Sequence, residues 1–274
     1  MSFTKKQRRR QTVFRWVVLT SVLGFLMIPL LSMLIFTFRQ PLSKTEPWTV
    51  KTWATVFGTG ESNDRMERIW EGLNNSLLMG VLTVFLMLAL LLPTMLIARL
   101  YSPKLLKVVE FFTTLPLALP AIALVVGLGP VFRFMAAEMG MEDSYWLGLA
   151  YVIFVLPYSF RAIDAGMKQM DVRTLYEAAR SLGESWMGTL MRVIVPNLRS
   201  AILSACFISV TVVLGEYTIA ALLLRQNLQT SLYLIGQSDP SISSAMSLLA
   251  LLFAMLVLVI IDILSGRKKG AKRG

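Results

Sequence analysis

One ionisable residue, Glu216, stands inside a long apolar stretch of this 274-residue chain, in the sequence Leu214-Gly215-Glu216-Tyr217-Thr218. A carboxyl group within a membrane span is costly, so it normally faces a cavity or a partner group. Two roles remain open for Glu216 at this point. It could line a solute pathway together with Tyr217 and attract a cationic solute. It could instead be a buried, hydrogen-bonded or protonated carboxyl that holds helices together.

Other reactive side chains are scarce. The chain has no histidine and a single cysteine, Cys206, which excludes histidine-zinc sites, Ser-His-Asp triads and a disulfide within the chain. No G-x-x-x-x-G-K-[ST] phosphate loop occurs, and no polar segment has room for a nucleotide-hydrolysing domain. We therefore expect no catalytic residue, no metal site and no cofactor, and a membrane enzyme is the least supported class.

The apolar residues that surround Glu216 are part of a composition that indicates a membrane environment. Hydrophobic residues make up 55% of the sequence and the mean hydropathy is +0.65, which is more apolar than soluble domains are. The net charge of +11 does not indicate nucleic-acid binding, because the basic residues flank the apolar runs instead of forming one face of a domain.

Six uncharged or nearly uncharged stretches predict six transmembrane helices, since about 20 helical residues cross the hydrocarbon core. A cleaved signal peptide is not expected at the first, because its apolar run is long and ends in bulky residues. The six are residues 16–38, 72–98, 111–132, 144–160, 200–224 and 240–261. The fold class expected is an all-α polytopic membrane protein.

Lysine and arginine residues predict the orientation of these helices, because cytoplasmic segments carry more of them. Four segments hold 20 of the 27 basic residues. They are residues 1–15, 99–110, 161–199 and 265–274. Both termini and the 161–199 loop are therefore expected in the cytoplasm.

The 161–199 loop carries the most informative pattern. Thr174-Leu175-Tyr176-Glu177 fits a capping box, which predicts that a helix begins at Thr174. An apolar stripe is expected along it at Leu175, Ala178, Ala179 and Leu182. Gly183 is then expected to provide a left-handed C-cap, and a second short helix is expected from Ser185 through Trp186 to Val195, ended by Pro196. Two amphipathic helices joined at a glycine indicate a docking site for a protein or for lipid.

The same residues resemble a known family motif. Glu177-Ala178-Ala179, three residues, Gly183, nine residues and Val193-Ile194-Val195-Pro196 are similar to the "EAA" loop, E-A-A-x3-G-x9-I-x-L-P, of binding-protein-dependent ABC importer permeases. Val193 and Val195 replace the usual Ile and Leu. The resemblance covers roughly residues 75–264, beginning at Asn75-Ser76-Leu77.

The resemblance implies a type I importer permease in a bacterial inner membrane that forms half of a translocation pathway. It implies these partners: ABC ATPase subunits, a second homologous or identical permease, an external solute-binding protein and membrane lipid. It also implies that Glu177, Ala178, Ala179, Gly183, Trp186 and Pro196 dock on the ATPase. The expected organisation is a basic N-terminus (1–15), a first span (16–38), an outer loop (39–71), a permease core of five spans (72–264) and a basic tail (265–274).

Alternatives remain for the loop and for the chain. Glu177 could serve only as the capping-box carboxylate, and the apolar stripe could lie along lipid headgroups. An ion-coupled secondary transporter would need internal repeats and several intramembrane ionisable groups, and Glu216 is the one clear candidate here.

The substrate expectation rests on a finer resemblance. Leu115-Pro116…Leu119-Pro120 and Gly215-Glu216-Tyr217-Thr218 look most like permeases for polyamines, thiamine and ferric iron. The layout of the spans is similar to the spermidine/putrescine type. A polyamine is therefore the first expectation, with thiamine or ferric iron next.

Overall fold

The computed structural model describes residues 5–39, 48–58 and 63–266 of the chain. Within those ranges every regular element is a helix, and Arg39 and Trp48 form an isolated antiparallel β-bridge. The expectation of an all-α polytopic chain is confirmed. The chain divides into two compact units, residues 1–66 with 232–256 and residues 67–231 with 257–274.

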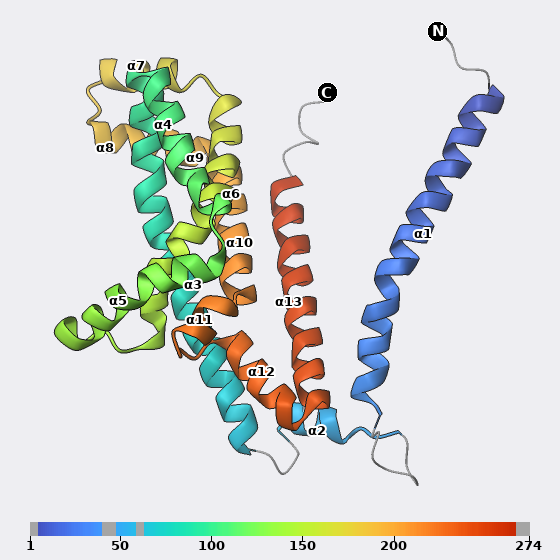
Figure 1. Ribbon diagram of the computed structural model, residues 1–274. Coiled ribbons are helices and arrows are strands. Elements are labelled where there is room, and N and C mark those ends of the chain that lie inside the picture. The colour runs from blue at the N-terminus through green and yellow to red at the C-terminus, as the bar shows by residue number, and fades with distance from the viewer. Residues whose placement is uncertain (1–4, 40–47, 59–62, 267–274) are drawn as a thin grey trace. The chain divides into compact units, whose positions relative to one another are not determined.

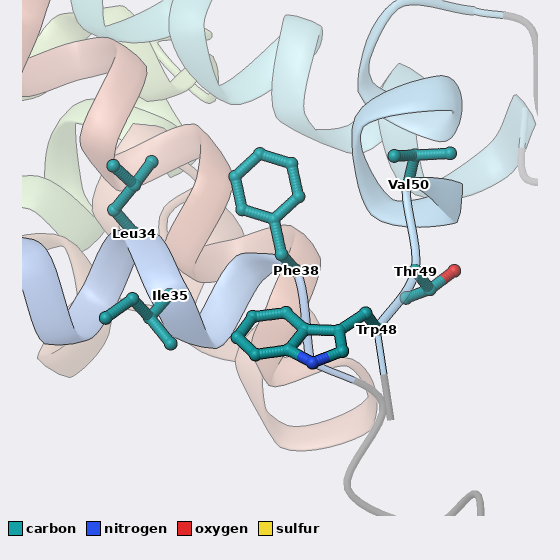
Figure 2. Close-up of a pocket in the computed structure, with 6 residues that line it drawn as sticks. All are labelled: Leu34, Ile35, Phe38, Trp48, Thr49 and Val50. Carbon is teal, nitrogen blue, oxygen red and sulfur yellow. The ribbon is translucent and has the colours of Figure 1, made fainter. Parts of the chain in front are cut away.

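The first unit contains the long N-terminal helix α1 (Lys5–Thr37), the short α2 (Lys51–Val56) and most of α13 (Pro240–Gly266). Arg65 and Asp239 form an ion pair at 3.0 Å in this unit. At the end of α1, a mostly apolar pocket of about 430 Å³ is lined by six residues, which Figure 2 shows. They are Leu34, Ile35, Phe38, Trp48, Thr49 and Val50.

The second unit contains most of α3 and the helices that follow it as far as the first turn of α12. They are α3 (Asn63–Tyr101), α4 (Pro103–Thr114), η1 (Leu115–Ala118), α5 (Ala121–Met139), η2 (Ser144–Leu147), α6 (Gly148–Lys168), α7 (Val172–Ser181), α8 (Trp186–Thr189), η3 (Leu190–Ile194), α9 (Val195–Asn197), α10 (Arg199–Gly215), α11 (Thr218–Leu222) and α12 (Leu228–Ser238). Within this unit, Figure 1 shows α7 and α8 at one end of α6 and α10, with α11 toward the opposite end.

Helix α6 lies at the centre of the second unit. Its Tyr151, Phe160 and Ile163 are at most 2% exposed and belong to one apolar core with residues of α3 and α10. Helix α6 packs extensively against α10. Ser159 and Ser209 share a buried hydrogen bond of 3.0 Å across this contact. These two helices also enter and leave the 161–199 loop, so they fix its position.

Two of the expected spans are not continuous helices. The 111–132 stretch is broken at Leu119, which is extended because the ring of Pro120 disfavours helix in the preceding residue. The 200–224 stretch is broken at Glu216, which is also extended. The fourth span is longer than expected, because its helices run from Ser144 to Lys168.

Four described helices are long and apolar enough to cross a membrane. They are Gln11–Thr37, Asp64–Tyr101, Ala121–Met139 and Ser144–Lys168. A fifth results if Trp186–Asn197 and Arg199–Gly215 count as one bent span, and α13 contributes the shorter apolar helix Pro240–Phe253. The count of six and the cytoplasmic termini stay predictions. Most of the basic tail (265–274) and the segments 40–47 and 59–62 of the 39–71 loop lie outside the described residues.

Candidate functional site

The helix that carries Glu177 begins two residues earlier than expected. Helix α7 starts at Val172, and its N-cap is Asp171, whose carboxylate accepts hydrogen bonds from the Thr174 backbone N–H (3.1 Å) and from the Thr174 hydroxyl (2.6 Å). The predicted capping box was therefore wrong, because Thr174 is the residue that Asp171 caps.

The hydrogen bonds from Thr174 also set the charge state of the cap. The Thr174 hydroxyl and, to a smaller extent, the Thr174 backbone N–H stabilise the ionised carboxylate by donating to it. The pKa of Asp171 therefore lies below its usual value. The lowered pKa means that the charged form of Asp171 is favoured. A negative charge at this position favours the helix through its dipole.

Without a capping role, Glu177 projects from the middle of α7. Its Oε1 accepts a hydrogen bond from Nε of Arg173 at 2.8 Å, one helical turn away. Both side chains are more than half exposed, so this pair contributes little to stability. Glu177 is thus a solvent-facing carboxylate whose charge is available to a partner.

The turn after α7 has the conformation expected of Gly183. Its φ is +85°, and the backbone N–H groups of Gly183 and Glu184 donate to the carbonyls of Arg180 and Ala179. This is a Schellman motif with Gly183 at the left-handed position. The predicted glycine C-cap is confirmed.

The second helix does not end where proline was expected to end it. Ser185 caps α8 by accepting a hydrogen bond from Gly188 N, and a π-helical turn, η3, precedes Pro196. The wider turn accommodates the missing N–H of proline, so the helix runs on to Asn197. It then bends by 81° into α10.

The apolar stripe of α7 is also displaced from the predicted one. Val172 and Ala179 are buried and Leu175 is half-buried, whereas Ala178 and Leu182 face outward. Leu182 is 87% exposed, and Met187 and Met191 in the second helix are each more than half exposed. We refer to Ala178, Leu182, Met187 and Met191 as the exposed apolar surface of the loop.

Two kinds of contact hold the two short helices in a fixed arrangement. Arg180 donates to the Glu184 carbonyl at 2.7 Å, and Arg192 pairs with the Glu184 carboxylate at 2.9 Å. Trp186 is partly buried against the apolar core of the unit. Below the loop, buried Asp164 of α6 pairs with Arg99 of α3 and with Lys168. The loop is therefore a braced projection from α6 and α10.

Glu216 lies away from this loop, at the break between α10 and α11. Its Oε1 accepts a hydrogen bond from Ile219 N at 2.8 Å, and its Oε2 accepts one from the Tyr151 hydroxyl at 2.9 Å. Asn227 Nδ2 donates to its backbone carbonyl at 2.7 Å. Tyr217, its neighbour, is 37% exposed.

Tyr151 and Asn227 were not predicted as site residues from the sequence. Asn227 and Thr230 form a reciprocal cap at the start of α12: Thr230 N donates to Asn227 Oδ1 at 2.8 Å, and Asn227 N donates to Thr230 Oγ1 at 2.9 Å. The pattern Asn-Leu-Gln-Thr was a usable signal for that helix start. No local pattern pointed to Tyr151. Among the described residues, no group of three or more Cys, Asp or Glu side chains is placed to hold a metal ion.

Comparison with known proteins connects this geometry to a family. Residues 94–269, which include both the loop and the break at Glu216, match the model described as "Binding-protein-dependent transport system inner membrane component".

Three curated relatives carry related descriptions. The chain is 32% identical over 68% of its length to a ferric transport system permease protein, FbpB 1, of Haemophilus influenzae, of which it covers 28%. It is 27% identical over 54% of its length to a 2-aminoethylphosphonate transport system permease protein, PhnV, of Salmonella typhimurium, of which it covers 55%. It is 32% identical over 37% of its length to the spermidine/putrescine transport system permease protein PotC of Haemophilus influenzae, of which it covers 38%.

The chain thus spans between about a quarter and about half of the length of these relatives. The family match nevertheless covers well over half of the chain itself, and several described helices are long and apolar enough to span a membrane. These findings place the chain in a bacterial inner membrane as a multi-pass protein. It belongs to the family of inner membrane components of binding-protein-dependent transport systems, the permeases of ABC importers.

Proposed function

We propose that the chain forms half of a translocation pathway and takes its energy from ABC ATPase subunits that dock on the 174–196 loop. A second permease, homologous or identical, forms the other half, and an external solute-binding protein delivers the solute. In this proposal the permease core is residues 72–264, and residues 1–15 and 265–274 are cytoplasmic. Residues 16–38 form the first span and residues 39–71 an outer loop.

The exposed apolar surface of the loop is the observation that carries this proposal. Leu182 is 87% exposed although the helix that precedes it buries Val172 and Ala179 against the core. A large apolar side chain held outward by a capped and braced loop is typical of a contact that another protein covers. Glu177 on the same helix adds a negative charge for a cationic partner group.

The rigidity of the loop supports the same proposal. Asp171 caps its first helix, Gly183 fixes the turn, and Glu184 is bonded to both Arg180 and Arg192. Each of these contacts restricts the conformations of the loop, so the loop should move with a docked subunit instead of deforming. Displacement at the loop should therefore be passed on to α6 and α10, into which it continues.

Reconstitution of the assembled transporter in proteoliposomes tests the proposal directly. Solute uptake should require the ATPase subunits, ATP and the loaded binding protein, and the ATPase should co-purify with this chain. Uptake by this chain with no ATPase present would overturn the proposal.

The charge of Glu177 is expected to contribute to docking. Glu177→Gln keeps the size of the side chain and, because Asp171 is the N-cap, leaves the cap of α7 intact. We expect ATPase affinity and coupled uptake to fall about three- to tenfold, as for the loss of one interfacial charge contact. Pull-down titration and uptake assays measure the two quantities. Glu138→Gln, at an exposed glutamate of α5, is the matched control. Equal behaviour of the two variants would mean that Glu177 has no part in docking.

For the substrate we propose a polyamine, with ferric iron or thiamine next. The acidic Glu216 within a broken span and the relative named for spermidine and putrescine transport support this order. Other relatives are named for ferric and phosphonate transport, so uptake of each solute class should be compared in the same vesicles.

A pathway role for Glu216 and Tyr217 is part of this proposal. Loss of the negative charge in Glu216→Gln should raise the KM for putrescine uptake about fivefold or more while the complex remains assembled. Measurement of KM and of complex yield separates affinity from assembly. An unchanged KM would remove Glu216 from the pathway and leave it a structural carboxyl.

A further inference from the structure

Helices α6 and α10, which the 161–199 loop connects, pack closely against each other. Helix α6 ends at the loop and α10 begins after it, and the two pack along their length. Near the loop, a Cβ on Gly166 of α6 would collide with the Cβ of Ala201 of α10, so the backbones approach closely. Farther along, the Ser159 and Ser209 hydroxyls are hydrogen-bonded and fully buried. Movement of the loop therefore carries both helices.

At the end of α10 that is distant from the loop, the helix stops at Gly215 and α11 starts at Thr218. A break inside a span leaves backbone groups without helical partners, which is costly away from water. Three side chains form hydrogen bonds with backbone groups at the break. Gln229 donates to the Leu214 carbonyl at 2.9 Å, Asn227 donates to the Glu216 carbonyl at 2.7 Å, and the Glu216 carboxylate accepts from Ile219 N at 2.8 Å.

The same side chains connect four helices. Asn227 is fully buried and also caps α12 through Thr230. Tyr151, fully buried at the start of α6, donates to the Glu216 carboxylate, which caps α11. The break is therefore tied to α6, α10, α11 and α12 at once. We call Tyr151, Glu216, Asn227 and Gln229 the break clamp.

The chain between α11 and α12 is held in a strained conformation. Leu224 has a φ of +54°, in the left-handed region that is unfavourable for a leucine. Neighbouring hydrogen bonds maintain it: Arg225 N donates to the Ala220 carbonyl at 2.8 Å, and Gln226 N donates to Ser144 Oγ at 3.1 Å. Strain of this kind persists only where the surroundings determine the conformation. The segment after the break is thus rigidly placed.

We propose that Tyr151, Asn227 and Gln229 are positioning residues for transport. Through the break clamp they make α11 and the start of α12 follow the movement of α6 and α10, so that the ATPase-driven displacement of the loop reaches the far end of the pathway. The inference rests on the proposed function, and it assigns Tyr151, Asn227 and Gln229 a role in coupling that is separate from solute contact. Without the clamp, the break is a free hinge that absorbs the displacement.

Asn227→Asp is the first variant, because it keeps a side-chain oxygen that can accept from Thr230 N at the start of α12 and removes the amide that donates to the Glu216 carbonyl. In the full transporter in proteoliposomes, basal ATP hydrolysis should stay within about twofold of the wild type. Stimulation of hydrolysis by loaded binding protein, and uptake with it, should fall about fivefold or more. Asn74→Asp adds the same charge at an exposed position on α3 and should show neither loss.

The outcomes separate this inference from the proposed function. Wild-type complexes that take up no solute with ATP would refute the proposed function itself. Working wild-type complexes, with Asn227→Asp as well stimulated as Asn74→Asp, would refute the clamp alone. Should Asn227→Asp lower the yield of complex, Tyr151→Phe decides by the same two readouts, since it removes one hydroxyl and keeps the ring. Normal stimulation in an assembled Tyr151→Phe complex would equally refute the clamp.

Discussion

Leu182→Glu should lower the affinity of the chain for its ATPase about 10- to 100-fold. Burial of a leucine side chain contributes about 1.5–3 kcal/mol to an interface, and a glutamate at the same place must in addition be desolvated. The side chain is 87% exposed in the isolated chain and sits at the C-cap of α7, so the fold itself should tolerate the change. Pull-down titration with the ATPase measures the loss, and thermal unfolding checks the fold.

A matched control for Leu182→Glu is available on the same side of the molecule. Gln169→Glu adds one negative charge at an exposed position between α6 and α7. It should bind the ATPase as the wild type does. A Leu182→Glu chain that binds and transports normally would show that the exposed apolar surface is not the docking contact.

Gly183→Val should have the second large effect, through the backbone. No atom lies within 4 Å of the position that a Cβ would occupy, so there is no steric clash and the whole cost comes from the φ of +85°. That cost is about 1–3 kcal/mol for a residue other than glycine and is greatest for a β-branched one. We expect the turn to change conformation, the second helix to be redirected, and ATP-dependent uptake to be lost.

Gly183→Asn provides the contrast, because asparagine tolerates the left-handed conformation better than valine does. Hydrogen exchange at the backbone amides of positions 183 and 184, which close the Schellman motif, should be faster in the valine variant than in the wild type. In the asparagine variant the increase should be much smaller. If Gly183→Val supports uptake at the wild-type rate, the fixed turn is not needed for coupling.

The parts of the loop that sequence alone predicted are those that depend on local backbone chemistry. A glycine after an amphipathic segment indicates a left-handed C-cap, and Gly183 has that conformation. The start of the helix was misplaced because Asp171 and Thr174 are both good N-caps and lie three residues apart. Tertiary packing decides which of the two residues caps the helix. Val172 and Ala179 pack inward, and in this orientation of the helix Ala178 and Leu182 face solvent.

The break at Glu216 illustrates what hydropathy does not report. A window of apolar residues predicts that a segment prefers lipid, but not that its helix is continuous. Continuity depends on whether other groups satisfy the opened backbone. Here Asn227, 11 residues after Glu216, donates to the Glu216 carbonyl, and Gln229 donates to the Leu214 carbonyl. Tyr151, 65 residues before Glu216, donates to its carboxylate. Glu216 was correctly singled out as unusual, while its partners could be found only in three dimensions.

The 81° angle between the second loop helix and α10 has a mechanical consequence. When α10 stands upright in the bilayer, the Trp186–Asn197 segment lies nearly flat against the membrane surface. In the proposed complex, a docked subunit that moved along the axis of that segment would pull on it, and the corner at Leu198 would turn the pull into a torque about the foot of α10. The angle therefore favours tilting of the span over its vertical displacement, and tilting can open one side of a channel while it closes the other.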